Sequence, residues 1–487
     1  MNHRNCYIAF KAKDVRFDGR FFVGVSSTGI YCRPVCKAKL PKAENCTFYD
    51  TAAAAEQAGF RPCLLCRPEL APGLVPFTHG LSLASRAARL LEENSGSGQK
   101  LEELLQDLGC SGRHLRRVFS AEYKVTPVQY LQTCRLLLAK NLLTDTNLPV
   151  TEVAMAAGFG SLRRFNHLFQ KQYRLTPTAL RRETAGAKGC DSHVRLILGY
   201  RPPYQWQQML NFLASRAIPG VEVVNHNEYK RTVHFINSEQ KGVSGWIRVA
   251  HHPQKNYLTV AFDSALLPVL PQVLARVRHL FDLYCDPGAV YETLATMNQI
   301  LSGLCLPGIR LPGCLDPFEM SVQAVLSQHN TMETACLLAG KLAQNYGKPV
   351  ATGIEGVTHV FPSARCIAVL NNSTTDPFTS LGISDTDAKV IVKLAAMLAQ
   401  EEIDFTSCAQ FEQVLPKLMA IQGLTDWTAQ YIAMRALSWP DIFPYPDCGV
   451  QKALSFISEN EILDRAETWR PWRSYAVVNL WNYLLSI

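Results

Sequence analysis

The spacing of apolar residues divides the chain into four blocks. Residues 80–183 and 291–487 carry apolar positions at helical intervals, interrupted by short glycine and proline breaks, and this pattern predicts helices in both blocks. Residues 192–290 mix helical stretches with short runs of β-branched and aromatic residues, which indicate strands. Residues 1–75 hold the closest cysteine pairs, are expected to form a small α/β domain and end in a turn-rich run. The predicted strands are Val221–Val224, Thr232–Ile236 and Tyr257–Phe262.

The length of the chain points to several domains. A chain of 487 residues is long enough for about three or four domains of ordinary size. The glycine- and alanine-rich run Ala185–Gly189 has the composition of a linker. We therefore predict an α+β, multidomain fold. The expected domains are residues 1–78, 79–184, 192–290 and 291–487.

The composition is that of a globular protein. Hydrophobic residues make up 47% and charged residues 18% of the chain, which excludes a disordered protein. No apolar run reaches the roughly 18 residues that a membrane-spanning helix needs, and the first residues lack the apolar core of a secretory signal. We expect a cytoplasmic protein with no membrane partner, whose 16 cysteines are free thiols or metal ligands.

The positive charge is concentrated in the first part of the chain. Residues 1–190 hold 27 lysines and arginines against 15 aspartates and glutamates, a net charge of +12, whereas residues 191–487 hold 22 against 26, a net charge of −4. A basic front part favours a nucleic-acid partner there. The alternative is a basic surface without a function, and charge alone does not decide between the two.

Two close cysteine pairs lie in the first block. Cys32 and Cys36 form one pair, and Cys63 and Cys66 form the other. Two such pairs can converge on one tetrahedral ion, and zinc prefers thiolate ligands of this kind. A small domain also gains stability from such a site. The spacing itself favours a structural zinc and leaves a reactive site open.

The residues around these pairs resemble the N-terminal domain of the Ada methylation-response family. The matching stretches are Thr28–Cys36 and Ala58–Cys66. The resemblance implies one zinc ion per chain, held by all four cysteines, with Cys32 accepting a methyl group from a methylated DNA phosphotriester. A plain zinc-binding module without a methyl acceptor remains the alternative, and the detailed match around Cys32 argues against it.

Thiolate chemistry suits this role. A zinc-bound cysteine stays a thiolate at neutral pH, and the thiolate attacks a methyl carbon. Four thiolates on one Zn²⁺ give the site a formal charge of −2, and methylation of one sulfur reduces it to −1 by the same count. The methylated surface then tolerates DNA phosphates better, so a stoichiometric repair event becomes an affinity switch.

The second block contains one pattern twice. Leu101–Ser111 and Val150–Ser161 each read as a helix, a turn and an N-cap, and each opens a basic helix. Two helix-turn-helix units about 50 residues apart resemble the AraC-type DNA-binding domain, over about residues 82–182. An ordinary helical bundle with basic faces is the alternative. The candidates for DNA contacts are Arg113, Arg116, Arg163 and Arg164.

A hairpin and a proline-rich loop mark the last block. Ile421–Ala429 is typical of a helix-hairpin-helix, in which glycine permits a turn whose N–H groups face a phosphate. Phe443–Lys452 follows and contains Asp447. Alone, this aspartate would favour a helix N-cap, but the two motifs together resemble the base-excision glycosylase superfamily. Stretches across residues 196–487 are similar to the AlkA-type 3-methyladenine-DNA glycosylases, which combine an α/β subdomain with a helix-hairpin-helix domain.

The resemblance implies a role for each matched residue. Asp447 would stabilise the oxocarbenium-like sugar, and an aromatic pocket would stack on a flipped, alkylated base. The pocket residues are Phe212, Trp427, Tyr431 and Trp481. The DNA-binding residues are Gln328 and His329, where the family inserts a wedge, and Gly423 and Thr425 in the hairpin.

The chain departs from the family pattern at three places. Gln422 stands where a proline is usual, Thr425 replaces a hairpin glycine, and Cys448 follows the aspartate where AlkA has an aromatic residue. Glycosylases with lyase activity carry a nucleophilic lysine at the position of Trp427, so we expect a monofunctional enzyme. No cysteine follows Cys448, so we expect no iron–sulfur cluster, and the alkylguanine transferase motif of Ada is also absent.

Together these resemblances predict a bacterial, nucleoid-associated protein with three parts. They are a zinc-dependent methyl-acceptor domain, an AraC-type regulator that binds promoter DNA and contacts RNA polymerase, and a glycosylase that acts on alkylated double-stranded DNA. The alternative is a transcriptional regulator whose glycosylase-like half binds damaged DNA but is catalytically weak, and Asp447 argues against it.

Overall fold

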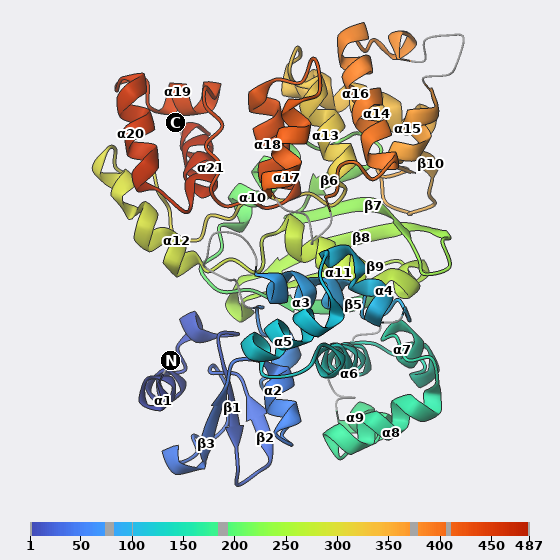
Figure 1. The fold of residues 1–487 in the computed structure, drawn as a ribbon, viewed down its shortest axis with the longest axis vertical. Helices are drawn as coiled ribbons and strands as arrows, with labels where there is room; N and C mark the ends of the chain where they lie inside the picture. The colour runs from blue at the N-terminus through green and yellow to red at the C-terminus, as the bar shows by residue number, and fades with distance from the viewer. Residues whose placement is uncertain are drawn as a thin grey trace. The chain divides into compact units, whose positions relative to one another are not determined.

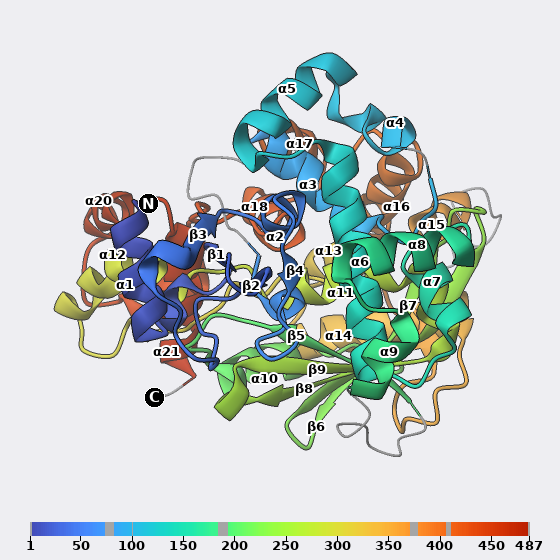
Figure 2. The ribbon, with the colours of Figure 1, turned by 90° about the horizontal axis from the view of Figure 1, so that it is seen from below.

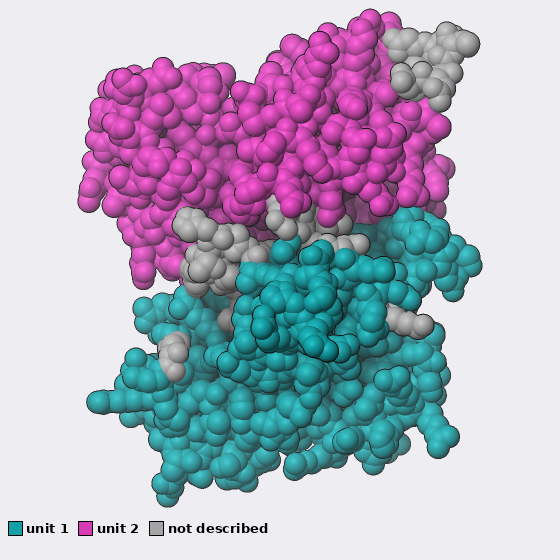
Figure 3. Space-filling view, viewed as in Figure 1, with its two compact units in different colours: residues 1–202, 235–243, 252–275 teal, residues 203–234, 244–251, 276–487 magenta. Residues whose placement is uncertain are grey.

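The structure is a computed structural model that describes residues 2–73, 82–99, 101–183, 193–370, 378–405 and 411–485. It divides into two compact units, one formed by residues 1–202, 235–243 and 252–275 and the other by residues 203–234, 244–251 and 276–487 (Figure 3). The α+β, multidomain prediction is confirmed. The domain boundaries remain predictions, and the expected linker Ala185–Gly189 lies outside the described residues.

An N-terminal subdomain, residues 2–73, opens the first unit. Its four-stranded sheet has the order β3-β1-β2-β4, in which β1 pairs antiparallel with both β2 and β3 while β4 runs parallel to β2 (Figure 1). The elements are α1 (His3–Ala12), η1 (Val15–Phe17), β1 (Phe22–Val25), β2 (Ile30–Cys32), η2 (Ala43–Asn45), β3 (Cys46–Tyr49), α2 (Ala52–Gln57), β4 (Arg61–Pro62) and η3 (Pro68–Leu70).

A helical subdomain, residues 82–183, follows in the same unit. The two predicted helix-turn-helix units are present, and the predicted N-caps Ser111 and Ser161 each accept a backbone N–H from the first turn of the following helix. The long helix α6 connects the two helix-turn-helix units (Figure 2). The elements are α3 (Leu83–Glu93), α4 (Leu101–Leu104), η4 (Gln106–Leu108), α5 (Gly112–Tyr123), α6 (Pro127–Asp145), α7 (Val150–Ala156), α8 (Leu162–Tyr173) and α9 (Pro177–Glu183).

The third block contains a five-stranded sheet of order β5-β9-β8-β7-β6. The three predicted strands fall in β6, β7 and β9, whereas β5 and β8 were not predicted. The elements are β5 (Val194–Gly199), α10 (Trp206–Ala214), β6 (Glu222–Asn225), β7 (Glu228–Ile236), β8 (Gly242–His252), η6 (Pro253–Lys255), β9 (Tyr257–Phe262), η7 (Ser264–Val269), α11 (Leu270–Leu280), α12 (Pro287–Leu294) and η8 (Ala295–Gln299).

The last block is helical, as predicted, and its apolar side chains form one large core within the second unit. A short pair of strands is its only sheet among the residues described. The elements are α13 (Pro317–Leu326), α14 (Met332–Tyr346), β10 (Lys348–Pro349), β11 (His359–Val360), α15 (Ala364–Leu370), η9 (Thr379–Leu381), α16 (Asp385–Ala399), α17 (Phe411–Met419), α18 (Asp426–Ala436), α19 (Cys448–Ala453), α20 (Glu459–Thr468) and α21 (Arg473–Leu484).

Across the described parts of the chain, no helix combines the length and the apolar character that crossing a membrane requires.

Glu56 of α2 is buried where the two subdomains of the first unit meet. Its carboxyl group accepts hydrogen bonds from Tyr31 at 3.0 Å, from Thr133 at 2.9 Å and from Tyr173 at 3.5 Å. Burial raises the pKa of Glu56 to about 8, although these hydroxyl groups act in the opposite direction.

This pKa predicts how the stability of the first unit depends on pH. The folded protein keeps a proton on Glu56 that the unfolded chain loses above pH 4.5. The Glu56 contribution therefore lowers the free energy of unfolding by about 1.4 kcal/mol per pH unit as the pH rises towards 8. We expect Glu56→Gln, which is neutral throughout, to lose this slope.

Hydrogen exchange in urea, measured on peptides from residues 2–183 between pH 5 and pH 8, tests the expectation. Glu44→Gln replaces an exposed carboxylate of the same subdomain and should keep the wild-type slope. Equal slopes in wild type and Glu56→Gln would contradict the assignment.

Candidate functional sites: a four-cysteine cluster and an aspartate among aromatic rings

The four predicted cysteines converge on one point. Their sulfur atoms all lie within 4.8 Å of one another. Cys32 ends β2 and Cys63 follows β4, and the parallel pairing of these strands places the two side by side. Cys36 and Cys66 each follow three or four residues later, which brings their sulfurs back to the same place.

The donor set suits zinc. Four zinc-bound sulfurs at a Zn–S distance of about 2.3 Å lie roughly 3.8 Å apart in a tetrahedron, which the cluster accommodates. Three of the cysteines are buried and Cys66 is partly exposed, and no carboxylate or imidazole of the described residues joins the group. A zinc ion held here would therefore have only sulfur ligands.

Arg33 supports the cluster from within. Its backbone N–H donates to the Cys66 sulfur at 3.3 Å, and its guanidinium group donates to the Cys66 carbonyl oxygen at 3.2 Å. The carboxylate of Asp18 pairs with the same guanidinium group. This pairing satisfies a buried cation and fixes the loop that carries Cys66.

The four arginines predicted to contact DNA lie on the second helices of the two helix-turn-helix units. They are exposed, whereas the aromatic residues of the same helices are buried in the subdomain. The amphipathic pattern thus leaves the basic face free for phosphate or base contacts. The arginines are Arg113 and Arg116 on α5, and Arg163 and Arg164 on α8.

Asp447 is the N-cap of α19 and is 4% exposed. Its Oδ1 accepts hydrogen bonds from the backbone N–H of Val450 at 2.7 Å and from the Trp481 indole at 2.9 Å. Its Oδ2 accepts a bond from the Trp427 indole at 2.9 Å. Both readings of the loop are therefore present, since the aspartate caps a helix and also faces the predicted aromatic residues.

The four predicted pocket aromatics lie together in the second unit. Trp427 stacks on Tyr431 with ring centroids 5.1 Å apart, Tyr431 lies 6.1 Å from Trp481, and Trp481 stacks on Phe212 at 6.2 Å. A side chain at Gly449 would lie 2.7 Å from Trp481, so glycine is needed for the indole to reach the aspartate. Phe212 precedes the other three by more than 200 positions in the sequence, and the fold brings all four into one cluster.

Sequence reasoning missed two arginines in this cluster. The guanidinium carbon of Arg216 lies 3.8 Å above the Phe212 ring, and that of Arg435 lies 5.0 Å from it. Both donate to the Tyr431 hydroxyl, at 3.2 and 3.1 Å. Each follows its aromatic neighbour by four residues, the spacing of one helical turn, and this spacing was the available signal.

The arginines also change the chemistry of Tyr431. Burial alone raises the pKa of Tyr431, but Arg435 and Arg216 outweigh burial and lower the pKa below its usual value. Arg435 is itself held by the carbonyl oxygens of Pro312 and Gly313. The hydroxyl end of the ring is therefore fixed by two cations, while its faces remain in the aromatic cluster.

The predicted wedge residues contact the hairpin and a neighbouring helix. Gln328 donates to the Gly423 carbonyl at 3.1 Å and accepts from the Thr425 backbone N–H at 2.8 Å. His329 is half exposed and its Nδ1 lies 2.9 Å from the buried Asp387 carboxylate. Asp387 was not predicted. Thr425 caps α18 through its hydroxyl group, so the departure from glycine serves the helix.

Family models match three parts of the chain. They are the metal binding domain of Ada over residues 5–69, a helix-turn-helix domain over residues 104–183 and the AlkA N-terminal domain over residues 195–316. The first contains the whole cysteine cluster, and the cofactor is therefore one zinc ion per chain.

Curated relatives match over the same parts and over the whole. The "Probable bifunctional transcriptional activator/DNA repair enzyme AlkA" of Mycobacterium tuberculosis is 34% identical over 98% of this chain and 96% of its own length. Two proteins of Escherichia coli match in part: DNA-3-methyladenine glycosylase 2 is 32% identical over 58% of this chain and 95% of its own length, and the bifunctional transcriptional activator/DNA repair enzyme Ada is 38% identical over 30% and 40%. Because the similarity to the Mycobacterium tuberculosis protein runs almost from end to end of both chains, this chain belongs to the family of bifunctional transcriptional activator/DNA repair enzymes AlkA.

Proposed function

We propose that the protein both senses and repairs alkylated DNA. It takes a methyl group from a DNA phosphotriester onto Cys32, which turns it into a transcriptional activator, and it excises alkylated bases such as 3-methyladenine as a monofunctional glycosylase. The observation that carries the sensor half is the convergence of four sulfurs on one point. The observation that carries the repair half is Asp447, held between two indoles of an aromatic cluster.

Methyl transfer is a displacement at carbon. A bound zinc ion keeps the cysteine sulfurs as thiolates. The Cys32 sulfur attacks the methyl carbon, an S–C bond forms, and the bond between the methyl carbon and the phosphotriester oxygen breaks. Its electron pair stays on the phosphate oxygen, which restores an ordinary phosphodiester. The thioether is not reversed, so each chain reacts once.

The hydrogen bonds around the cluster argue against Cys66 as the acceptor. Cys66 accepts the Arg33 N–H, and a sulfur that accepts a hydrogen bond is a weaker nucleophile. Cys32 is 6% exposed and Cys63 is 7% exposed, so burial does not separate these two sulfurs. The alternative acceptors Cys36 and Cys63 remain distinguishable by experiment.

The switch follows from charge. Methylation removes one negative charge beside a chain that is already basic in its first 190 residues, so phosphate binding becomes more favourable. The exposed arginines of α5 and α8 then contact promoter DNA. An activator of this type also contacts RNA polymerase.

Base excision depends on the free lone pair of Asp447. Two donors occupy Oδ1, whereas Oδ2 has one donor and keeps a lone pair. This lone pair can face the sugar C1′ as positive charge develops there, while the alkylated base leaves with the electrons of the glycosidic bond. Trp427 cannot form a Schiff base, so the product is an intact abasic strand.

The surrounding residues open the duplex and hold the base. Gln328 and His329 enter the base stack, and the hairpin at Gly423 and Thr425 binds a phosphate next to the lesion. The flipped base stacks on the cluster of Phe212, Trp427, Tyr431 and Trp481. The guanidinium of Arg216 must leave the Phe212 face before a base can use it.

The metal is tested first. Removal of zinc by a chelator, or replacement of Cys36 by serine, should destabilise residues 2–73 because the free energy of metal binding contributes to folding and is lost with the ion or weakened with a ligand. Metal analysis of the wild-type protein should give one zinc per chain. Hydrogen exchange in that subdomain should be faster in the metal-free protein and in Cys36→Ser than in wild type. The Cys46→Ser variant serves as the control, since Cys46 is buried outside the cluster. Full zinc content in a triple variant of Cys36, Cys63 and Cys66 would refute the site.

The methyl acceptor is tested by mass spectrometry. After incubation with duplex DNA that carries methylphosphotriesters, the methyl group should be found on the peptide with Cys32, and Cys32→Ser should take up none. Affinity for duplex DNA should rise in the methylated protein. This affinity should decrease as the salt concentration increases, as it does for proteins that contact DNA phosphates. A methyl group on Cys36, Cys63 or Cys66 would overturn the assignment.

Asp447→Asn keeps the shape of the side chain and removes its charge. Release of 3-methyladenine from duplex DNA should fall roughly 10²–10³-fold, the usual effect of a pre-organised electrostatic group. Zinc content and methyl uptake should stay unchanged. Asp464→Asn, on the exposed face of α20, is the matched control. Wild-type excision by Asp447→Asn would refute the role, and borohydride trapping of a protein–DNA adduct would refute monofunctional cleavage.

A further inference from the structure

The residue before the methyl acceptor is tied to the helical subdomain through Glu56. Tyr31 precedes Cys32 on β2 and is fully buried, and its ring meets Phe22 edge to face at 5.8 Å. Its hydroxyl donates to Glu56 Oε1 at 3.0 Å. Because the ring is closely packed, a displacement of β2 is passed on to this hydrogen bond.

The other contacts of the Glu56 carboxyl group belong to helices that carry or position the DNA-contacting arginines. Thr133 of α6 donates to Oε2 at 2.9 Å, and Tyr173, the last residue of α8, lies 3.5 Å from Oε1. The neighbouring Gln172 also donates to the backbone carbonyl oxygens of Glu56 and Phe60, each at 3.2 Å. The C-terminal end of α8 is therefore bonded to α2.

A second contact between the same subdomains differs in its chemistry. Both oxygens of Glu69 accept from Lys140 of α6 at 2.6 Å, and Arg67, directly after Cys66, pairs with Glu69 at 2.9 Å and with Asp145 at 2.7 Å. These are buried charge pairs. Among the described residues, the Glu56 carboxyl group accepts hydrogen bonds only from neutral hydroxyl groups, which form weaker and more easily exchanged bonds, although the charge of Lys140 also acts on it.

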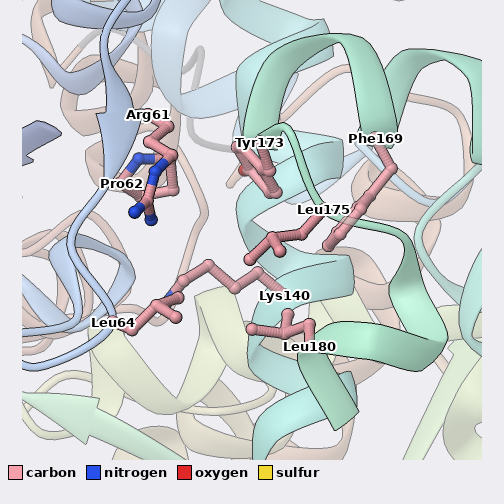
Figure 4. Close-up of a pocket in the computed structure, with 8 residues that line it drawn as sticks. All are labelled: Arg61, Pro62, Leu64, Lys140, Phe169, Tyr173, Leu175 and Leu180. Atoms are coloured by element: carbon pink, nitrogen blue, oxygen red, sulfur yellow. The ribbon is translucent and has the colours of Figure 1, made fainter. Parts of the chain in front are cut away.

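A small pocket lies beside the Glu56 contact. Figure 4 shows Arg61 and Pro62 of the N-terminal subdomain on one side and Phe169 and Tyr173 of α8 on the other. Tyr173 lines this pocket, so the packing around its ring is incomplete on that side. The charge-paired contact can therefore hold the subdomains together while the Glu56 contact changes.

Methylation supplies the displacement. A methyl group on Cys32 adds a carbon to a buried sulfur among three others that lie within 4.8 Å. Close-packed interiors absorb such an addition by shifting neighbouring backbone, and the neighbouring residue is Tyr31.

We propose that Glu56 is a positioning residue that couples the methylation state of Cys32 to the orientation of α8, so that the rise in DNA affinity is mechanical as well as electrostatic. This inference rests on the proposed function, because it requires methyl transfer to Cys32. Through Tyr31, Glu56 and Tyr173, a change at the sulfur reaches the helix that carries Arg163 and Arg164.

The experiment uses the full-length chain with zinc bound. The double variant Thr133→Val/Tyr173→Phe removes the two hydroxyl groups that reach Glu56 from the helical subdomain and leaves the Tyr31 bond. Tyr130→Phe is the matched control, because its hydroxyl donates to Glu92 at 2.5 Å within the helical subdomain. Each protein is methylated with methylphosphotriester duplex, and the methyl group on Cys32 is quantified. Affinity is then measured before and after methylation on a duplex selected from random sequences by methylated wild-type protein.

Wild type and the control should show the same rise in affinity on methylation, within twofold. The double variant should take up methyl at the wild-type rate, yet its rise should be at least fivefold smaller, the usual lower range of coupling between sites. Hydrogen exchange of residues 162–173 should change on methylation in wild type and not in the double variant. If the double variant is unstable, the single variants are compared, each with a smaller loss.

An undiminished rise in the double variant, with unchanged exchange in α8, would overturn the inference and leave a purely electrostatic switch. Failure of the proposed function looks different, because wild type itself would then take up no methyl group on Cys32 or would show no rise in affinity. That result would remove the coupling as well.

Discussion

A carboxyl group that is taken out of water must be met by donors or cations, and both compact units are organised around this constraint. In the second unit three N–H groups meet Asp447, and two of them belong to tryptophans 20 residues before and 34 residues after it. In the first unit Lys140 and Arg67 meet Glu69, and three hydroxyl groups meet Glu56. Each carboxyl group joins segments distant in sequence, because an unpaired one would cost several kcal/mol.

The secondary-structure elements and metal ligands that could be predicted from the sequence are those whose signals lie within a few neighbouring residues. Serine N-caps at Ser111 and Ser161, the strand Tyr257–Phe262 and the hairpin glycine at Gly423 lie where their patterns predict, since a cap or a turn depends on a few neighbouring residues. The cysteine pairs are also local signals, and the β2–β4 pairing only had to bring them together.

The missed residues have no local signal. Glu56 lies in an alanine-rich helix, and there a glutamate ordinarily faces solvent. It is buried only because α6 and α8 pack over it. Asp387 likewise lies in the first turn of a helix, as many exposed aspartates do, and its contact with His329 comes from the turn between α13 and α14. Arg216 and Arg435 had a helical spacing to their aromatic neighbours, but the meeting of the two pairs required the tertiary fold.

The two buried glutamates of the first unit, Glu69 and Glu56, form contacts of different kinds between the subdomains: the Glu69 contact is strong, and the Glu56 contact can rearrange. Burial raises the pKa of a carboxyl group, yet Lys140 and Arg67 outweigh burial and lower the pKa of Glu69, so this contact strengthens the folded state at neutral pH. Burial raises the pKa of Glu56 to about 8, and no cation of the described residues forms an ion pair with it, so its burial costs stability at neutral pH, where an apolar side chain of similar volume would not. Glu56 costs stability, yet it forms hydrogen bonds to β2, α6 and α8. Its role is therefore better explained by the orientation in which it holds these elements. The charge pairs hold the subdomains together, and the hydroxyl contacts can then rearrange without loss of the interface.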